Sequence, residues 1–201
     1  MTPIYRLWLR KFKGTENIPR PPFIVSANHS SYYDTLLPHM LLIPRAQRKI
    51  HAMANARFWN FPLAKQVLNH GECIPLYLKN EPNAKEKNKV AFEIAMEYLK
   101  KGDIILMFPE GTRSPDGKLK KAHKGIARLA LTAKVPVLPF GIINSHKVLP
   151  KGKVFPRFER CEVSIGKPIY FNKKINEKSL EEVTRKIMKD IAKLVGQDYN
   201  Y

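Results

Sequence analysis

The sequence contains few cysteines. Cys73 and Cys161 are the only two among its 201 residues. Two are too few for a disulfide framework, and both lie in apolar stretches where cysteine acts as a small hydrophobic residue. A reducing compartment is therefore expected. The histidines are scattered among unlike contexts, and no group of His and Cys has the spacing of a metal site. The sequence thus predicts neither a metal centre nor a disulfide framework.

Acidic residues are also scarce. The chain has 17 Asp and Glu against 36 Lys and Arg, a formal net charge of +19. Such an excess favours a polyanionic partner, which can be nucleic acid, an anionic membrane surface or an acidic carrier protein. The basic residues are spread along the chain, without an RRM, KH, zinc-finger or basic-zipper signature. We therefore expect no nucleic-acid partner, and a membrane surface or an acidic carrier remains.

Long hydrophobic runs are absent. No run approaches the ~18 to 20 residues that a membrane-spanning helix needs, and charges interrupt residues 1–13 where a signal sequence would have its apolar core. Apolar residues recur there at near-helical spacing among basic ones: Ile4, Leu7, Trp8 and Phe12. We expect residues 1–13 to form a short amphipathic helix that lies on a membrane. The alternative is that these residues pack on the core of the domain.

Strands and helices alternate along the rest of the chain. Apolar runs that predict strands fall at 23–27, 50–54, 73–78, 104–108, 136–142 and 161–165. Segments that predict helices fall after the first strand to about residue 40, before a stop at Pro44, and then at 62–69, 84–101, 125–134 and 179–195. This order indicates an α/β layer structure in a single domain, and the chain is long enough to bury its core.

A histidine and an aspartate follow the first of these strands. Residues 28–34 read NHSSYYD, and five residues correspond to about 500° along a helix. The two side chains can meet only if His29 lies in the turn and Asp34 on the helix that follows, with Ser30 or Ser31 as N-cap. An aspartate bonded to one imidazole nitrogen leaves the other free to take a proton from a hydroxyl. Taken alone, the pair also fits an ordinary capping contact.

A second polar motif follows another strand-like run. Residues 108–114 read FPEGTRS and come directly after the apolar run at 104–107. Together with NHSSYYD, this motif resembles the first and third sequence blocks of the glycerolipid acyltransferases, specifically the 1-acylglycerol-3-phosphate acyltransferase family. Two further stretches resemble the remaining blocks: GECIPL at 71–76 and VPVLPF at 135–140. All four occur in the family's order.

The resemblance implies a fold and a reaction. The fold would be a glycerolipid acyltransferase-like mixed β-sheet flanked by helices, with the acyltransferase domain over residues 14–201. The reaction would transfer a fatty acyl group from acyl-CoA or acyl carrier protein to the free hydroxyl of 1-acyl-sn-glycerol-3-phosphate, giving phosphatidic acid in phospholipid biosynthesis. The thioester is a co-substrate, and no cofactor is expected. The protein would act at the cytoplasmic face of a membrane, as a peripheral or monotopic enzyme.

The resemblance also implies catalytic roles. His29 would be the general base and Asp34 its orienting partner, so that the acceptor hydroxyl attacks the thioester directly. A serine nucleophile would need its own base, and nothing resembles a Gly-x-Ser-x-Gly elbow. Because Cys73 lies in the second block, a covalent acyl-cysteine is the alternative. We favour direct transfer.

Acceptor binding would fall to the third block. Arg113 offers a planar fork that matches a phosphate. Glu110 would accept hydrogen bonds from acceptor hydroxyls or hold Arg113 in place, and Gly111 lets the backbone approach the ligand. Thr112 favours a monoacyl acceptor, by resemblance only. Lys79 would contact the anion as a point charge.

The second block departs from the family pattern near Lys79. Relatives usually have an arginine two or three residues after the Ile-Pro step of the second block, where this chain has Tyr77 and Leu78. A lysine cannot form the bidentate fork, so glycerol-3-phosphate, another lysophospholipid or a lyso-aminolipid remain possible acceptors. A noncatalytic basic module that binds anionic membranes or nucleic acid would explain the net charge. It would not explain why both motifs follow strand ends.

Overall fold

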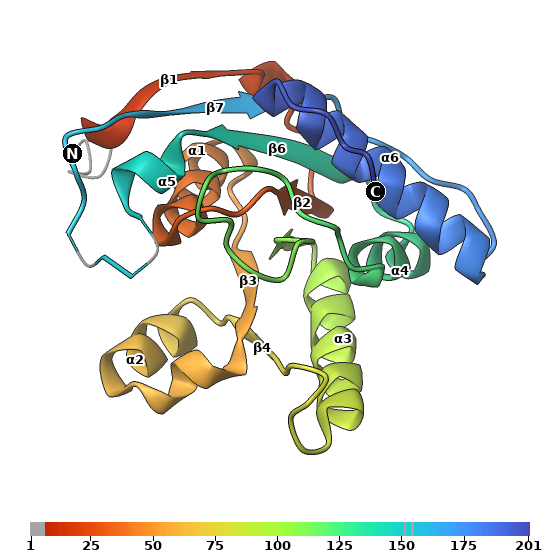
Figure 1. Ribbon diagram of the computed structural model, residues 1–201. Helices are drawn as coiled ribbons and strands as arrows, with labels where there is room; N and C mark the ends of the chain where they lie inside the picture. Colours follow the sequence, from red (N-terminus) through yellow and green to blue (C-terminus); the bar gives the residue numbers. More distant parts are fainter. Residues whose placement is uncertain (1–6, 151, 154) are drawn as a thin grey trace.

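Seven strands form one mixed sheet in the computed structural model, which describes residues 7–150, 152–153 and 155–201 (Figure 1). The strands are β1 (Leu9–Lys13), β2 (Phe23–Ala27), β3 (Ile50–Asn55), β4 (Ile74–Leu76), β5 (Ile104–Met107), β6 (Val137–Ile143) and β7 (Cys161–Ile165). Their order is β1-β7-β6-β2-β5-β3-β4. β7 runs antiparallel to β6, and the other neighbours are parallel. The predicted α/β fold with a mixed sheet is confirmed.

Helices cover both faces of this sheet. The α-helices are α1 (Leu36–Ala46), α2 (Pro62–His70), α3 (Ala84–Lys100), α4 (Gly125–Ala133), α5 (Ser145–Val148) and α6 (Glu177–Val195). The 3-10 turns are η2 (Thr15–Asn17), η3 (Tyr32–Thr35) and η4 (Ala56–Asn60). One core cluster joins the sheet to α3, α4 and α6, and the other joins it to α1 and α5.

The central strand β2 shows why its sequence is almost entirely apolar, with Ser26 as its one polar residue. Ile24 belongs to the first core cluster, whereas Phe23 and Val25 belong to the second. All three side chains are fully buried. A strand covered by helices on both faces reads as a near-continuous hydrophobic run, without the alternation of a half-exposed strand.

The helix predicted over residues 1–13 is wrong for the part of it that the structure describes. Leu9–Lys13 is the edge strand β1, which pairs in parallel with β7; residues 1–6 lie outside the described residues. Trp8, Leu9 and Phe12 pack against the core, so the alternative reading holds for them. Pairing with β7 gives this backbone its hydrogen-bond partners. A helix of so few residues would be marginal on its own, so the apolar spacing does not decide the structure here. Membrane association of residues 1–13 stays a prediction.

The end of α1 also differs from the prediction. Pro44 lies inside the last turn and does not stop the helix, which continues to Ala46. A proline there removes one hydrogen bond, which would have gone to the carbonyl four residues earlier, and the helix ends only two residues later. Gln47 closes it in the left-handed conformation, with φ at 52°.

The two polar motifs come together at one edge of the sheet. β2, β3, β4, β5 and β6 are mutually parallel, so their carboxyl ends lie at the same edge. β5 is a direct neighbour of β2. The turn after β2 therefore lies beside the turn after β5. No helix in the described part of the chain is long and apolar enough to cross a membrane.

Candidate active site

His29 and Asp34 are in hydrogen-bonding contact. His29 follows β2, and its Nδ1 lies 3.0 Å from Oδ2 of Asp34 in η3. The same carboxylate oxygen accepts hydrogen bonds from the backbone N–H groups of Ser30 at 2.6 Å and Ser31 at 2.7 Å. Ser31 is the N-cap of η3, and its hydroxyl accepts from the N–H of Tyr33. Asp34 is fully buried, and these two backbone hydrogen bonds hold its carboxylate against the imidazole.

This contact determines what His29 can do. A carboxylate at Nδ1 favours the tautomer that carries its proton there, which leaves Nε2 as an acceptor for a hydroxyl proton. The His29 side chain is 16% exposed, so the ring is mostly enclosed but reachable. It stacks on Phe108 with ring centroids 4.1 Å apart. The ring is therefore held from its edge by Asp34 and from its face by Phe108.

Glu110 joins the two motif turns. Its Oε1 accepts a hydrogen bond from the backbone N–H of His29 at 2.9 Å, and its Oε2 accepts one from the N–H of Lys120 at 2.8 Å. In the reverse direction, the N–H of Ser114 donates to the carbonyl of His29 at 2.8 Å. Burial raises the pKa of Glu110 to about 7, against the two backbone hydrogen bonds, which lower it. Both carboxylate oxygens already have protein partners, so contact between Glu110 and acceptor hydroxyls stays a prediction.

Arg113 places a buried cationic group against the Tyr32 ring. The residue is only 8% exposed, and its guanidinium lies 3.5 Å from the centroid of the Tyr32 ring. Its Nη1 is buried and has no hydrogen-bond partner among the described residues. Burying a charged donor without a partner is costly. An anion that accepts from this nitrogen would remove the cost.

The remaining predicted site residues differ in placement. Gly111 has φ at +66°, and a Cβ there would lie 3.0 Å from Cδ2 of His123, so its backbone conformation and its surroundings both favour glycine. Thr112 is exposed beside it. Lys79 is exposed in the turn after β4, and β3 separates β4 from β5 in the sheet. In the described part of the chain, no hydrogen bond or ion pair links Lys79 to His29 or Arg113.

The C-terminal segment holds the loop that follows the second motif, which the sequence did not reveal. Oε1 of Gln197 accepts from the N–H of Leu119, and its Nε2 donates to the carbonyl of Gly117, both at 3.0 Å. The hydroxyl of Tyr199 accepts from the N–H of Ala122 at 3.0 Å. Side-chain contacts with loop backbone, nearly 80 residues away in sequence, leave no local pattern. The roles of Tyr32 and Phe108 beside His29 were also missed, although both lie within the two motifs.

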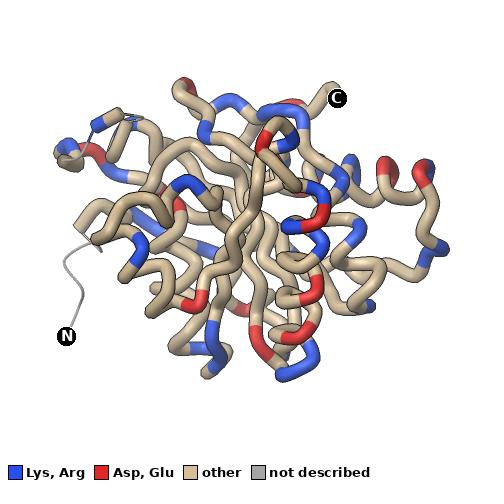
Figure 2. The backbone as a smooth tube through the Cα atoms, turned by 90° about the horizontal axis from the view of Figure 1, so that it is seen from below, with Lys and Arg blue, Asp and Glu red and all other residues tan. Residues whose placement is uncertain are grey.

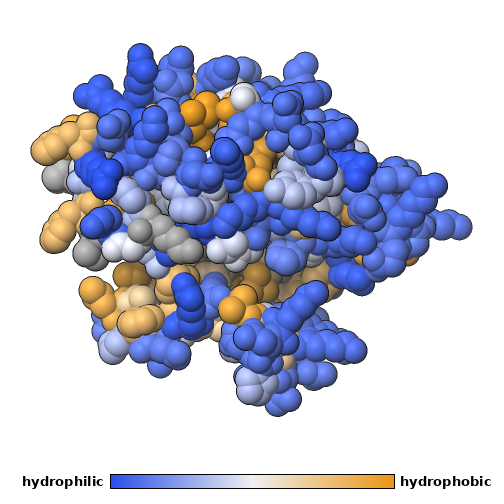
Figure 3. Space-filling model, viewed as in Figure 1, coloured by the Kyte–Doolittle hydropathy of each residue, from blue (hydrophilic) through white to orange (hydrophobic). Residues whose placement is uncertain are grey.

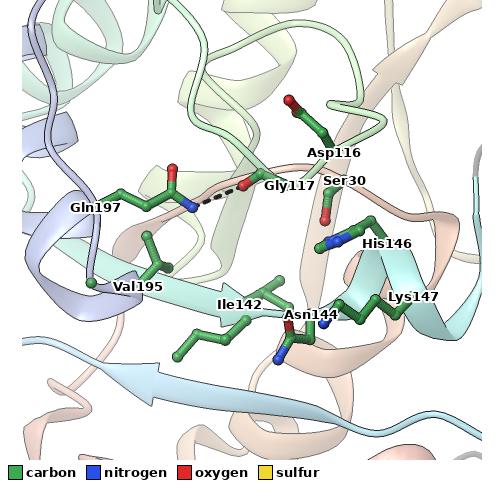
Figure 4. A pocket seen from close by; sticks show the side chains of 11 residues that line it. Ser30, Asp116, Gly117, Ile142, Asn144, His146, Lys147, Val195 and Gln197 are labelled. Atoms are coloured by element: carbon green, nitrogen blue, oxygen red, sulfur yellow. Dashed lines mark hydrogen bonds between the residues drawn. The ribbon is translucent and has the colours of Figure 1, made fainter.

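A polar cleft of about 400 Å³ lies at the carboxyl end of β6. Figure 4 shows Val195 and Gln197 on one side of it and Ser30 and His146 on the other. The Ser30 hydroxyl is 2.8 Å from that of Ser145. Neither His29 nor Arg113 lines this cleft, so the candidate chemistry lies on the β5 side of the turn after β2.

The two cysteines do not supply an activated nucleophile. Burial raises the pKa of the Cys73 thiol, and it raises that of Cys161 to about 12. The thiolate is the nucleophilic form, and these shifts disfavour it. The raised pKa values of both thiols therefore argue against the acyl-cysteine alternative. Among the described residues, no three His, Cys, Asp or Glu side chains gather as a metal site would require.

The fold and the paired motifs define a class. The sequence profile of the acyltransferase family matches residues 10–143, a span that contains every residue of the two motifs. The chain belongs to the acyltransferase family, and the resemblance to the 1-acylglycerol-3-phosphate acyltransferases is confirmed.

Individual relatives narrow the comparison. A 1-acyl-sn-glycerol-3-phosphate acyltransferase of Pseudomonas aeruginosa is 33% identical over 141 residues, 69% of this chain and 51% of the relative. The chloroplastic 1-acyl-sn-glycerol-3-phosphate acyltransferase BAT2 of Brassica napus is 28% identical over 173 residues, 85% of this chain and 48% of the relative. The chain spans about half the length of these curated relatives. The crystal structure of the 1-acyl-sn-glycerophosphate (LPA) acyltransferase PlsC from Thermotoga maritima matches with a TM-score of 0.69 at 26% identity, over 97% of this chain and 76% of that one.

Proposed function

We propose that the protein transfers a fatty acyl group from an acyl thioester to the free hydroxyl of 1-acyl-sn-glycerol-3-phosphate, giving phosphatidic acid. The observation that carries the proposal is the presence, on adjacent turns, of an oriented imidazole and a buried guanidinium whose Nη1 has no hydrogen-bond partner among the described residues. The N–H of Ser114, the residue after Arg113, donates to the carbonyl of His29. The turn that carries the base for a hydroxyl is therefore hydrogen-bonded to the turn that carries the cation for a phosphate.

His29 acts as the general base in this mechanism. Nε2 takes the proton of the acceptor hydroxyl as its oxygen attacks the thioester carbonyl, and Asp34 stabilises the imidazolium that forms. The new ester C–O bond forms, the C–S bond breaks, and the proton passes from the imidazolium to the departing thiolate. The reaction needs no acyl-enzyme, because the acceptor hydroxyl is the nucleophile throughout.

Arg113 binds the acceptor phosphate. Its guanidinium lies over the Tyr32 ring, and its fork of donors suits the bidentate contact that arginine makes with phosphate oxygens. Gly111 and Thr112 border this position, and Lys79 would add a more distant positive charge. The names of the relatives support a lysophosphatidate acceptor.

The donor and the setting belong to the same proposal. Acyl-CoA and acyl carrier protein are both polyanionic donors, and the net charge of +19 suits either one. The same charge suits an anionic membrane surface, where a lysophosphatidate acceptor resides. We place the protein at the cytoplasmic face of a membrane as a peripheral or monotopic protein.

A reconstituted transfer assay tests the proposal. Purified protein is incubated with radiolabelled acyl-CoA or acyl carrier protein and with lysophosphatidate, and labelled phosphatidate is quantified. Parallel reactions offer glycerol-3-phosphate, a neutral lysophospholipid or a lyso-aminolipid. We expect transfer to lysophosphatidate that His29→Ala abolishes. Transfer to one of the other acceptors only would overturn the acceptor assignment, and equal transfer by His29→Ala would overturn the mechanism.

A further inference from the structure

The η4–α2 hairpin, residues 56–70, is poorly covered by the rest of the protein. None of the residues of η4 or α2 is buried. Figure 1 shows α2 at the lower left, projecting away from the main body of the sheet. A helix of nine residues is marginal in water without a surface to pack on. The hairpin therefore presents a face that a partner could cover.

Apolar side chains gather on this face. The exposed fractions of Phe61, Leu63 and Val67 are 61%, 76% and 66%. Leu63 and Val67 are four residues apart in α2 and lie on the same side of the helix, and Phe61 immediately precedes it. Figure 3 shows apolar residues at the lower left, over α2. We name Phe61, Leu63 and Val67 the α2 face.

The charge around the α2 face indicates the chemistry of its partner. The hairpin, residues 56–70, contains no Asp or Glu. Its two basic residues, Arg57 and Lys65, are both exposed. The whole chain has 36 Lys and Arg against 17 Asp and Glu, and Figure 2 shows the basic residues spread along it. Exposed apolar side chains among cations, without acids, are typical of a surface that enters the headgroup region of an anionic bilayer.

The same charge argues against a second copy of the chain on this face. A twofold contact would bring Arg57 and Lys65 close to the same residues of the other copy, with no acid in the hairpin to pair them. Like charges at an interface disfavour such association. An anionic lipid surface pairs with both of these cations.

The hairpin is in contact with the candidate phosphate site. The ring of Phe58 in η4 meets the ring of Tyr32 edge-on, with centroids 5.8 Å apart. Tyr32 carries the Arg113 guanidinium on its face. Two ring contacts therefore connect the hairpin to the cation assigned to the acceptor phosphate.

We infer that the α2 face is the surface by which this protein enters an anionic bilayer, so that an acceptor lipid reaches Arg113 without leaving the membrane. The delivery of the acceptor rests on the proposed function, whereas the binding to lipid does not. Membrane association of residues 1–13 stays a separate prediction, which this inference does not require.

Vesicle co-sedimentation without any acyl donor tests the inference independently of the reaction. The double variant Leu63→Glu/Val67→Glu is compared with Val90→Glu, a matched change at an exposed aliphatic residue of α3. The double variant replaces the two aliphatic side chains of α2 with carboxylates that an anionic surface repels, so it should bind vesicles of phosphatidylglycerol and phosphatidylcholine at least about tenfold more weakly. Val90→Glu should bind like the wild type. Equal binding by the double variant would overturn the inference.

Fluorescence provides a second measurement that a folding defect cannot imitate. The chain has two tryptophans, and only Trp59 lies on the hairpin. In a Trp8→Phe background, Trp59 emission should shift to the blue when anionic vesicles are added to the otherwise unmodified protein. An unchanged spectrum would overturn the inference, as would a concentration-dependent dimer in size-exclusion chromatography that the double variant abolishes.

Discussion

The carboxylate of Glu110 accepts a hydrogen bond from the backbone N–H of His29 at 2.9 Å. This contact joins the turn after β2 to the turn after β5, and the hydrogen bond from Ser114 to the carbonyl of His29 closes the pair. A buried acid in the acyltransferase motif is thus a bridge between two loops. The position of the His29 ring depends on the second motif as much as on Asp34.

Glu110→Gln should disturb this bridge. Both carboxylate oxygens accept from N–H groups, whereas a glutamine has one acceptor oxygen and must turn its own NH₂ toward a donor. Leaving a buried N–H unsatisfied costs about 1–3 kcal/mol, so the free energy of unfolding should fall by that amount and transfer should fall with it. Chemical denaturation checks the first effect. A variant as stable as the wild type at pH 5, where the wild type still has the stabilisation that it loses at higher pH, would contradict the bridging role.

Glu110 should also make the stability of the protein depend on pH. Burial raises the pKa of Glu110 in the folded protein from its usual value of 4.5 to about 7, so the folded state binds an extra proton between these values. The stabilisation is fully present below about pH 4.5 and is lost as the pH rises through 7. The loss is on the order of 3 kcal/mol. The stability advantage of the wild type over Glu110→Gln should therefore be smaller at pH 8 than at pH 5, and an advantage that grows with pH would contradict the shift.

His29→Ala and Asp34→Asn should separate proton transfer from its support. Loss of the base should lower kcat by on the order of 10² to 10⁴, with the far-ultraviolet circular dichroism unchanged. In Asp34→Asn the amide oxygen can still accept from the N–H groups of Ser30 and Ser31, but a neutral amide does not stabilise an imidazolium. A small residual activity is expected. Wild-type turnover by either variant would exclude the assigned role.

The sequence predicted the fold and that both motifs follow strands, because both depend on local patterns. Buried strands such as Phe23–Ala27 read as apolar runs, and α6 repeats apolar residues at three and four residue steps over 180–194. Parallel neighbours then place the ends of β2 and β5 together. The spacing of His29 and Asp34 only permitted their contact, and it was the second motif and the resemblance that led us to expect a catalytic pair.

Long-range pairing explains what the sequence did not predict. Leu9–Lys13 was predicted as part of a helix from four apolar residues, but strand β1 forms through hydrogen bonds to β7, about 150 residues away. The contact of Gln197 with Gly117 and the position of Arg113 over Tyr32 likewise depend on tertiary structure. Glu110 was expected to accept hydrogen bonds from the acceptor or to hold Arg113 in place, and only the structure reveals that its two oxygens accept from the backbone N–H groups of His29 and Lys120.

Arg113→Lys should impair recognition of phosphate specifically. Lysine keeps the charge but loses the fork and the guanidinium contact with Tyr32. We expect KM for lysophosphatidate to rise about 10- to 100-fold, equivalent to about 1.4–2.8 kcal/mol, with a smaller change in kcat. Arg128→Lys is the matched control, because Arg128 is exposed on α4. Steady-state kinetics with lysophosphatidate and with a monoacylglycerol lacking the phosphate separate the effects. An equal loss with both acceptors would contradict a phosphate contact.

Tyr199→Phe should loosen the loop after the second motif. The Tyr199 hydroxyl accepts from the N–H of Ala122, and the same loop supplies the N–H of Lys120 that Glu110 requires. Removing the hydroxyl leaves a backbone donor without its partner, at a cost of about 1 kcal/mol. Lys118, Lys120 and Lys121 make the loop a substrate for trypsin, so cleavage there should accelerate about fivefold if local opening governs the rate.

The control for this change is Tyr201→Phe, since Tyr201 is 53% exposed and contacts Tyr199 only through its ring. In the Tyr201→Phe variant, trypsin should cleave the loop after the second motif at the wild-type rate. Combining Tyr199→Phe with Gln197→Ala removes the side-chain contacts with both Ala122 and Leu119, so cleavage should accelerate further and kcat should fall as the support for Glu110 weakens. Unchanged proteolysis in the double variant would show that the loop keeps its position without the C-terminal segment, and that the coupling from Tyr199 to His29 through Glu110 is absent.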